Sequence, residues 1–224
     1  MKESLCLFDL DHTLLPIDSD HAWGEFMIAI GWVDAAEFRR GNQEAYDQYR
    51  VGQLDIDAWI EFASRPFRTR SEGERRDAQA RFMREVIAPV MTPAAVGLVQ
   101  AHRERGDRVA LVTATNDFVT APIASAFAID TLIATRLERD GAGAMTGRID
   151  GVPSYREGKV ARVGQWLAAE GRGWGDFERI SVYSDSLNDL SLLERATDPV
   201  ATNPSTELEA VARERGWRIL TLFT

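Results

Sequence analysis

The chain has 224 residues, enough for one large domain or for one domain that carries a smaller inserted one. Its formal net charge of −9 argues against nucleic acid or an anionic membrane surface as the main partner. The single cysteine, Cys6, excludes an internal disulfide, and neither a signal-peptide layout nor an apolar run of membrane-spanning length is present, so we expect a cytoplasmic protein.

The first predicted element is a buried strand at residues 5–8, where four apolar residues follow one another. This strand leads directly into two carboxylates, Asp9 and Asp11, and the hydroxyl of Thr13. Ligands bind at the carboxyl ends of the strands in an open parallel sheet, so these groups mark a candidate active site. If the chain is still extended there, the two acids share a face and repel each other unless a cation lies between them. The alternative for such a short pattern is a loop in which an aspartate caps the next helix.

Residues 16–91 are predicted to form an inserted, all-helical segment. Helical spacing of apolar residues and cap residues predict helices from Asp18 to Gly31, from Asp34 to Tyr49, from Asp55 to Ala63, and from a capping box at residues 71–74 to Pro89. The aromatic residues of this segment recur at helical spacing, and we expect them to form its own core rather than a ligand site.

From residue 92 onwards, predicted strands alternate with predicted helices. The strands cover residues 108–112, 131–135, 179–183, 199–202 and 218–222. The helices cover residues 92–106, 157–169 and 205–215, with two shorter ones through residues 123–127 and Leu192, and a hairpin covers residues 136–152. This alternation predicts an α/β fold with a doubly wound parallel sheet, formed by residues 1–15 and 92–224.

Two later strands also end in polar residues. The second strand leads to Thr113 and Thr115, and the strand at 179–183 leads to Asp185, Asn188 and Asp189. In a parallel sheet these ends lie along one edge, and two converging carboxylate clusters suit Mg²⁺. Lys159, near the start of a helix, is the best placed residue to balance the charge of a phosphoryl group, although a single lysine is most often a solvated surface residue.

These residues carry a family resemblance that covers essentially the whole chain. The chain resembles the haloacid dehalogenase superfamily of phosphohydrolases, and within it the phosphoserine-phosphatase-like branch (subfamily IB), which has a helical cap after the first strand. The resemblance rests on four motifs in order, which are Asp9-Leu10-Asp11-His12-Thr13, the strand that ends at Thr113, Lys159, and Asp185-Ser186-Leu187-Asn188-Asp189. It implies a Rossmann-like catalytic core with residues 16–91 as a cap domain that closes over the site and sets substrate specificity.

The resemblance implies a Mg²⁺-dependent phosphatase. Asp9 would be the nucleophile that forms an aspartyl phosphate, and Asp11 would be the general acid and then the general base. A second acid at the position of Asp11 marks the phosphatases of the superfamily, whereas its carbon–halogen hydrolases lack it. The remaining implied roles are metal binding by Asp9, Asp185 and the backbone carbonyl of Asp11, support of the metal site by Asp189 and Asn188, and phosphate binding by Thr113, Ala114 and Lys159.

The substrate is left open by departures from the phosphoserine phosphatase pattern. Those enzymes typically have Ser-Gly-Gly at residues 113–115 and Gly-Asp-Gly at residues 184–186, where this chain has Thr-Ala-Thr and Ser-Asp-Ser. Asp18 stands where they usually have a glutamate that binds the substrate ammonium. Their carboxylate-binding arginine has no secure counterpart. The candidates are Arg65, Arg68 and Arg70, although an arginine is more often a surface residue. Relatives act on phosphoserine, histidinol phosphate and phosphorylated amino alcohols, and the sequence does not decide among these small phosphate monoesters.

Two alternative functions use the same residues. A phosphotransferase would pass the phosphoryl group from the aspartyl phosphate to another hydroxyl. A signalling receiver domain also combines acids, a threonine and a lysine, but receivers are about half this length and carry the phosphorylated aspartate on a later strand. The sequence is compatible with either a monomer or a homodimer.

Overall fold

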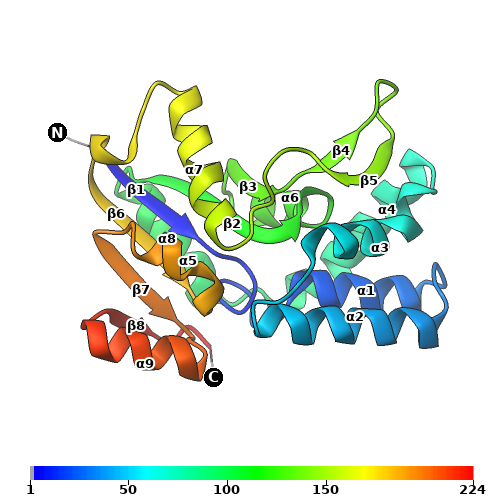
Figure 1. Ribbon diagram of the computed structural model, residues 1–224, viewed down its shortest axis with the longest axis horizontal. Helices are drawn as coiled ribbons and strands as arrows, with labels where there is room; N and C mark the ends of the chain where they lie inside the picture. Colours follow the sequence, from blue (N-terminus) through cyan, green and yellow to red (C-terminus); the bar gives the residue numbers. More distant parts are fainter. Residues whose placement is uncertain (1–2, 224) are drawn as a thin grey trace.

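The computed structural model describes residues 3–223 and contains a parallel sheet of six strands with helices on both faces (Figure 1). In order across the sheet, the strands are β3 (Thr131–Thr135), β2 (Arg108–Asn116), β1 (Glu3–Phe8), β6 (Phe177–Ser184), β7 (Asp198–Thr202) and β8 (Arg218–Leu220). All five neighbouring pairs are parallel. The predicted α/β fold with a doubly wound parallel sheet is confirmed.

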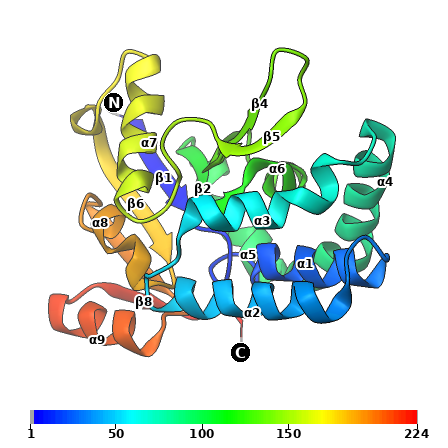
Figure 2. The ribbon, with the colours of Figure 1, turned by 45° about the vertical axis from the view of Figure 1, so that its right-hand side comes forward.

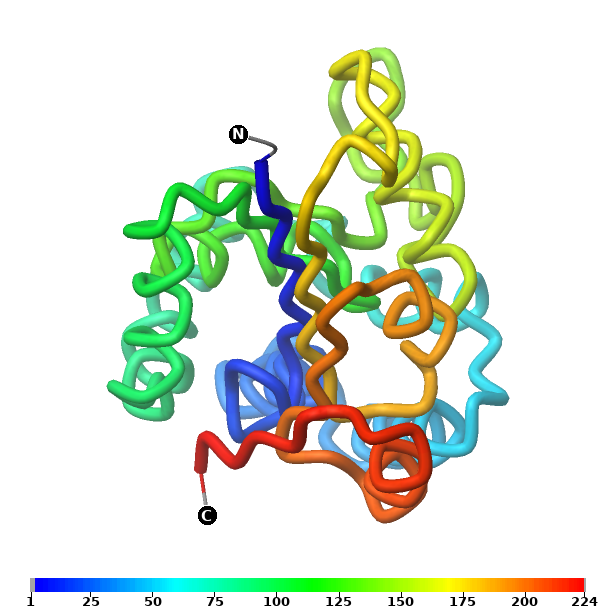
Figure 3. Tube along the Cα trace, turned by 90° about the vertical axis from the view of Figure 1, so that its left-hand side faces the viewer, coloured from blue at the N-terminus to red at the C-terminus, as the bar shows by residue number. Residues whose placement is uncertain are grey.

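Side chains of β1 alternate between two hydrophobic cores, one on each face of the sheet. Cys6 and Phe8 face the core that is covered by α5 (Pro93–Glu104) and α6 (Asp117–Ala126). Leu5 and Leu7 face the core that is covered by α7 (Glu157–Ala169), α8 (Leu190–Leu193) and α9 (Thr206–Arg215). Figure 3 shows β1, in blue, with the green segments on one side and the yellow helix α7 on the other. Burial on both faces explains why this strand is uniformly apolar.

The strand order reverses at β1. The chain passes from β1 to β2 and β3 on one side, and later to β6, β7 and β8 on the other. In the register of the sheet, Phe8 at the end of β1 pairs with Tyr183 near the end of β6. The carboxyl ends of these two strands therefore form the crevice in which open α/β sheets bind their ligands.

Four helices between β1 and α5 lie together beside this edge of the sheet (Figures 1 and 2). They are α1 (Ser19–Ala29), α2 (Ala35–Arg50), α3 (Ile56–Arg68) and α4 (Glu72–Phe82). Asp18, Asp34, Asp55 and Ser71 cap their N-termini, and the predicted capping box of Ser71 and Glu74 is confirmed.

The aromatic core of these helices is continuous with the core of the sheet. Trp23 contacts Phe82 at 5.0 Å and Phe118 at 5.6 Å between ring centroids. Phe67 stacks on Phe118 at 4.4 Å, and Phe118 belongs to α6. The aromatic residues therefore form a core, as we expected, but one that the helices share with α6.

Several elements extend beyond, or stop short of, their predicted bounds. The helix α3 continues to Arg68 through Pro66, because Ser64 and Phe67 are buried and this packing outweighs the hydrogen bond that the proline lacks. The helix α4 ends at Phe82, and a π-helical turn (Met83–Ile87) and a 3-10 turn (Ala88–Val90) follow it before the chain enters α5. The strand β2 continues to Asn116, whereas α8 is a single turn.

A hairpin of β4 (Leu137–Arg139) and β5 (Met145–Ile149) packs against α3 (Figure 2). Arg68 Nη1 donates a hydrogen bond to the backbone oxygen of Thr146 at 3.0 Å. Within residues 3–223, no single helix is long and apolar enough to cross a membrane; one pair of consecutive helical stretches passes the same test together, but it is bent by 95°.

Candidate active site

Two carboxylates from separate strand ends converge on one hydroxyl. Asp9 follows β1, and its N–H donates to the backbone oxygen of Tyr183 at 2.9 Å, which continues the pairing with β6. Asp185 follows the last residue of β6. Thr13 Oγ1 lies 3.1 Å from Asp9 Oδ2 and 3.4 Å from Asp185 Oδ1. The crevice therefore brings together two acids that lie 176 residues apart in the sequence.

Lys159 is a buried cation between two carboxylates. It is one of only two lysines in the chain, the other being Lys2. Its Nζ lies 2.8 Å from Asp9 Oδ1 and 2.7 Å from Asp189 Oδ2, and its exposed fraction is 1%. Burial lowers the pKa of Lys159, but the two carboxylates outweigh burial, so the net shift is upward. The side chain accordingly stays charged and ties α7 to the ends of β1 and β6.

Negative charge remains in excess around this lysine. Ser184 Oγ donates to Asp189 Oδ2 at 2.8 Å, whereas Asp189 Oδ1 is buried and has no hydrogen-bond partner among the described residues. Burial, and then Asp9 and Asp189, raise the pKa of Asp185 well above its usual range. An uncompensated group of buried carboxylates is the environment that a hard cation stabilises.

Asp11 is held apart from the Asp9–Lys159 pair by partners of its own. Its Oδ1 accepts from the backbone N–H of Ser19 at 2.7 Å, at the start of α1, and its Oδ2 accepts from Thr115 Oγ1 at 2.9 Å. Burial, and then the charge of Asp18, raise the pKa of Asp11 to about 6. A carboxyl group that titrates near neutral pH can both give and take a proton.

The predicted phosphate-binding residues lie near the carboxyl end of β2. Thr113 is buried, and its Oγ1 accepts from the backbone N–H of Thr115 at 3.2 Å. Ala114, between them, lines the pocket described below. Because β2 continues to Asn116, residues 113–115 belong to the strand rather than to the loop that the sequence predicted, and Thr115 is thereby directed at Asp11.

The donors present fit a magnesium ion. Within residues 3–223, no three His, Cys, Asp or Glu side chains form a set that could hold a metal ion by themselves. Mg²⁺, however, typically takes one or two carboxylates and keeps several waters. Asp9 and Asp185 supply two carboxylates on either side of Thr13, and the backbone carbonyl of Asp11 is two residues from Asp9.

A small pocket adjoins Asp11 and opens toward the helices. It encloses about 40 Å³, room for a few water molecules. Asp18, Asp20 and His21 from the start of α1 line it, together with the rings of Tyr46, Tyr49 and Trp59. Asp18 also caps α1 by accepting from the backbone N–H of His21 at 2.8 Å, so it has a structural role as well as a place in the pocket.

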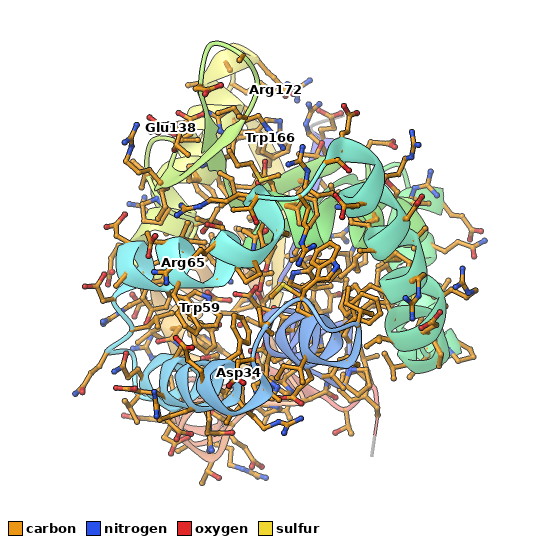
Figure 4. All side chains as sticks on the ribbon, turned by 90° about the vertical axis from the view of Figure 1, so that its right-hand side faces the viewer. Asp34, Trp59, Arg65, Glu138, Trp166 and Arg172 are labelled. Carbon is orange, nitrogen blue, oxygen red and sulfur yellow. The ribbon has the colours of Figure 1, made fainter. Side chains whose placement is uncertain are left out.

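Asp20 was not singled out by sequence reasoning, although both of its carboxylate oxygens are oriented by hydrogen bonds. Its Oδ2 accepts from Trp59 Nε1 at 2.6 Å and its Oδ1 from Asn116 Nδ2 at 3.3 Å. Burial, and then the charge of Asp18, raise the pKa of Asp20 to about 7. Trp59 lies between α3 and α2 (Figure 4), where it packs with Ala45. Only the folding of three elements onto one another reveals this arrangement.

The three arginines considered for substrate binding have other partners. Arg65 pairs with Glu61 at 3.0 Å on the same helix (Figure 4 labels Arg65). Arg68 pairs with Glu61 and with the hairpin, and Arg70 lies over the ring of Trp32 and near Glu74. Among the described residues, none of the three lines the pocket.

Asn188 and two residues missed by the sequence support the site from outside. Asn188 Nδ2 donates to the backbone oxygen of Tyr49 at 2.9 Å, so it reaches the helical segment. Ser184 holds Asp189, and a hydroxyl at the last position of a strand was a signal that could have identified it. Asn203 Nδ2 lies 3.0 Å from the backbone oxygen of His12 and supports the loop after β1 from a left-handed conformation (φ 45°) that asparagine tolerates.

Sequence comparisons relate the chain to known hydrolases. A sequence model of haloacid dehalogenase-like hydrolases matches residues 6–194. A histidinol-phosphatase from Neisseria meningitidis is 42% identical over 218 residues, covering 97% of this chain and 98% of that protein. A phosphoserine phosphatase from Mycobacterium tuberculosis is 30% identical over 222 residues, covering 95% of this chain and 68% of that protein.

Solved structures are similar over nearly the whole chain. A protein of unknown function from Bordetella pertussis superimposes with a TM-score of 0.94, at 49% identity and full coverage of both chains. A substrate-bound phosphoserine phosphatase superimposes with a TM-score of 0.66, at 18% identity, covering 98% of this chain and 93% of that one. At this low identity the second likeness shows a shared fold.

Proposed function

The chain belongs to the haloacid dehalogenase-like hydrolases, and on that basis we propose that it is a Mg²⁺-dependent phosphatase that hydrolyses a small phosphate monoester through an aspartyl-phosphate intermediate. The observation that carries the proposal is the contact of Asp9 with both Lys159 and Thr13 at the carboxyl end of the central strand. A carboxylate fixed by two partners at the crevice of an α/β sheet is oriented for attack on a ligand bound there.

Asp9 and Asp11 have different catalytic roles. An oxygen of Asp9 attacks phosphorus, and the bond from phosphorus to the substrate oxygen breaks as Asp11 gives that oxygen a proton. Asp11 then takes a proton from water, whose oxygen attacks the same phosphorus and releases inorganic phosphate and the Asp9 carboxylate. The pKa of about 6 for Asp11 suits both steps. The partners of Asp11, Ser19 and Thr115, keep its side chain oriented independently of Asp9.

Asp9, Asp185 and the backbone carbonyl of Asp11 would hold Mg²⁺, which when bound neutralises charge on the phosphoryl group. Lys159 contributes a permanent positive charge on the other side of Asp9. Thr113 and the backbone at Ala114 complete the phosphate site at the end of β2.

The helical segment, residues 16–91, acts in this proposal as a cap that closes over the reacting groups. The hydrogen bonds that join it to the rest of the chain near the site include one from Asn188 to the backbone of Tyr49 at 2.9 Å and one from Arg156 to the backbone of Gly52 at 2.8 Å. Most residues that line the pocket beside Asp11 belong to these helices and the loops between them, so movement of the helices would open or close it. Closure excludes bulk water from the first step.

Hydrolysis of p-nitrophenyl phosphate tests the proposal because turnover of this ester depends little on specific contacts between the substrate and the pocket. We expect Asp9→Asn to lower kcat by about 10⁴-fold or more while far-UV circular dichroism stays unchanged. We also expect a chelator to abolish wild-type turnover and Mg²⁺ to restore it. Turnover by Asp9→Asn at the wild-type rate would refute the assignment of the nucleophile. Product analysis with excess alcohol separates hydrolysis from phosphotransfer.

A further inference from the structure

We propose that the substrate is the phosphate monoester of an alcohol that bears a protonated amine and no carboxylate, and that Asp20, together with Asp18, selects it. The inference rests on the proposed phosphatase function and names the substrate class of that same site. It assigns to Asp20 a role in specificity that is separate from the chemistry of Asp9 and Asp11.

The charge of Asp20 has no cationic partner in the pocket. Both of its hydrogen-bond donors, Trp59 Nε1 at 2.6 Å and Asn116 Nδ2 at 3.3 Å, are neutral. Asp18 lies close enough for its charge to raise the pKa of Asp20. Two half-buried acids without a countercharge cost the free protein stability, and a bound cation would remove that cost.

Helix capping does not account for Asp20. The N-terminus of α1 is already capped by Asp18, so Asp20 is not required for that purpose. Instead, α3 and the end of β2 each supply a donor that points its carboxylate into the pocket beside Asp11. Three elements that hold one acid at the edge of a catalytic site orient it for a ligand.

A substrate carboxylate would find no partner in this pocket. Within residues 3–223, neither lysine nor arginine lines it, and His21 is its one basic side chain. Arg65, Arg68 and Arg70 are engaged elsewhere. A carboxylate placed among Asp11, Asp18 and Asp20 would be desolvated next to like charges, whereas an ammonium group would be stabilised by them.

The rest of the pocket wall suits the carbon skeleton of an organic cation. The rings of Tyr46, Tyr49 and Trp59 line it together with Leu54 and Ile56. Aromatic faces attract cations in addition to contacting apolar groups. The pocket therefore combines a cation site at its acidic end with an apolar wall.

Four phosphate esters test the inference in steady-state kinetics with Mg²⁺ present: histidinol phosphate, O-phosphoethanolamine, O-phosphoserine and the neutral-chain ester p-nitrophenyl phosphate. We expect kcat/KM for O-phosphoethanolamine and histidinol phosphate to exceed that for O-phosphoserine by about tenfold or more. Phosphoethanolamine and phosphoserine differ by the carboxylate alone, so the ratio of their kcat/KM values measures how strongly the pocket disfavours a substrate carboxylate.

The variant Asp20→Asn tests the role of that residue. We expect the ratio of kcat/KM for histidinol phosphate to that for p-nitrophenyl phosphate to fall by about tenfold or more, mainly through a higher KM for histidinol phosphate. The matched control is Asp57→Asn, which removes one negative charge from an exposed position two residues before Trp59 and should leave the ratio unchanged.

Two results would overturn the inference. One is cleavage of O-phosphoserine at least as efficient as that of O-phosphoethanolamine, and the other is an equal loss of activity on all four esters in Asp20→Asn, which would identify a structural role. Turnover of p-nitrophenyl phosphate that depends on Asp9 reports the phosphatase function separately. If that turnover is absent, the proposed function fails and the substrate class fails with it.

Discussion

Replacing Lys159 with methionine removes the ammonium group between two buried carboxylates while keeping a side chain of similar length. The wild-type Nζ lies 2.8 Å from Asp9 and 2.7 Å from Asp189, and the exposed fractions of the three side chains are 1%, 5% and 2%. Methionine fills the space but leaves both acids without the cation. We expect the variant to be folded at low denaturant and markedly less stable than the wild type.

The magnitude follows from the burial of the ion pairs. Removing one partner of a buried ion pair costs about 3–5 kcal/mol, because the remaining charge is neither solvated nor paired. Here two carboxylates lose the same partner, and protonation of one of them limits the loss. With a urea m-value of about 2–3 kcal/mol/M, the unfolding midpoint should fall by about 1–2 M.

Urea unfolding at pH 7 and pH 5, without added metal and followed by circular dichroism, measures this loss. The deficit should shrink at pH 5, because a carboxyl group left without Lys159 is protonated more readily there. The double variant Lys159→Met/Asp189→Asn should be more stable than Lys159→Met, since it leaves only one acid unpaired. Arg81→Met is the matched control: it breaks an exposed pair with Glu85 at 3.3 Å and should cost much less. A loss below about 1 kcal/mol, or no recovery in the double variant, would refute the reasoning.

Two further predictions concern the hairpin contact and the pH dependence of stability. Gly147→Ala should destabilise the protein by about 1–3 kcal/mol in urea unfolding, because Gly147 has a φ of +88° and an added Cβ would lie 1.4 Å from Arg68 Nη1. The control is Gly141→Ala, because Gly141 has open space around it. Equal stability of the two variants would contradict the prediction. The pKa of Asp20 is raised to about 7 in the folded state from an unfolded value near 3.9, so the folded state binds more protons between these two pH values. The free energy of unfolding without metal should therefore fall as the pH rises from 4 through 7. The contribution of this group is at most about 4 kcal/mol. The melting temperature should therefore decrease less between pH 5 and pH 8 for Asp20→Asn than for the wild type. An equal decrease in the two proteins would contradict the raised pKa of Asp20.

Local signals predicted most elements well because their causes lie within a few residues. The helix caps at Asp18 and Ser71 and the bounds of α7 at residues 157–169 are confirmed. Elements that depend on distant contacts were predicted less well. The extension of α3 past Pro66 depends on burial of Phe67 against α6, and the continuation of β2 to Asn116 depends on pairing with β3.

The two acids at the crevice could be identified from the amino-acid sequence. Asp9 and Asp185 directly follow apolar strands, and parallel strands bring their carboxyl ends to one edge, so an argument from local pattern was sufficient. Lys159 was proposed from its position near the start of a helix, and its partners could not be assigned from the sequence.

The pairing of these groups and their surroundings become apparent in the folded chain alone. The bond between Lys159 and Asp9 joins residues 150 positions apart, and the two bonds of Asp20 join α1 to α3 and to β2. Such contacts depend on the relative placement of whole elements, which hydrophobic periodicity does not encode. For the same reason the sequence offered three arginines for a substrate carboxylate, whereas the folded chain keeps all three away from the pocket.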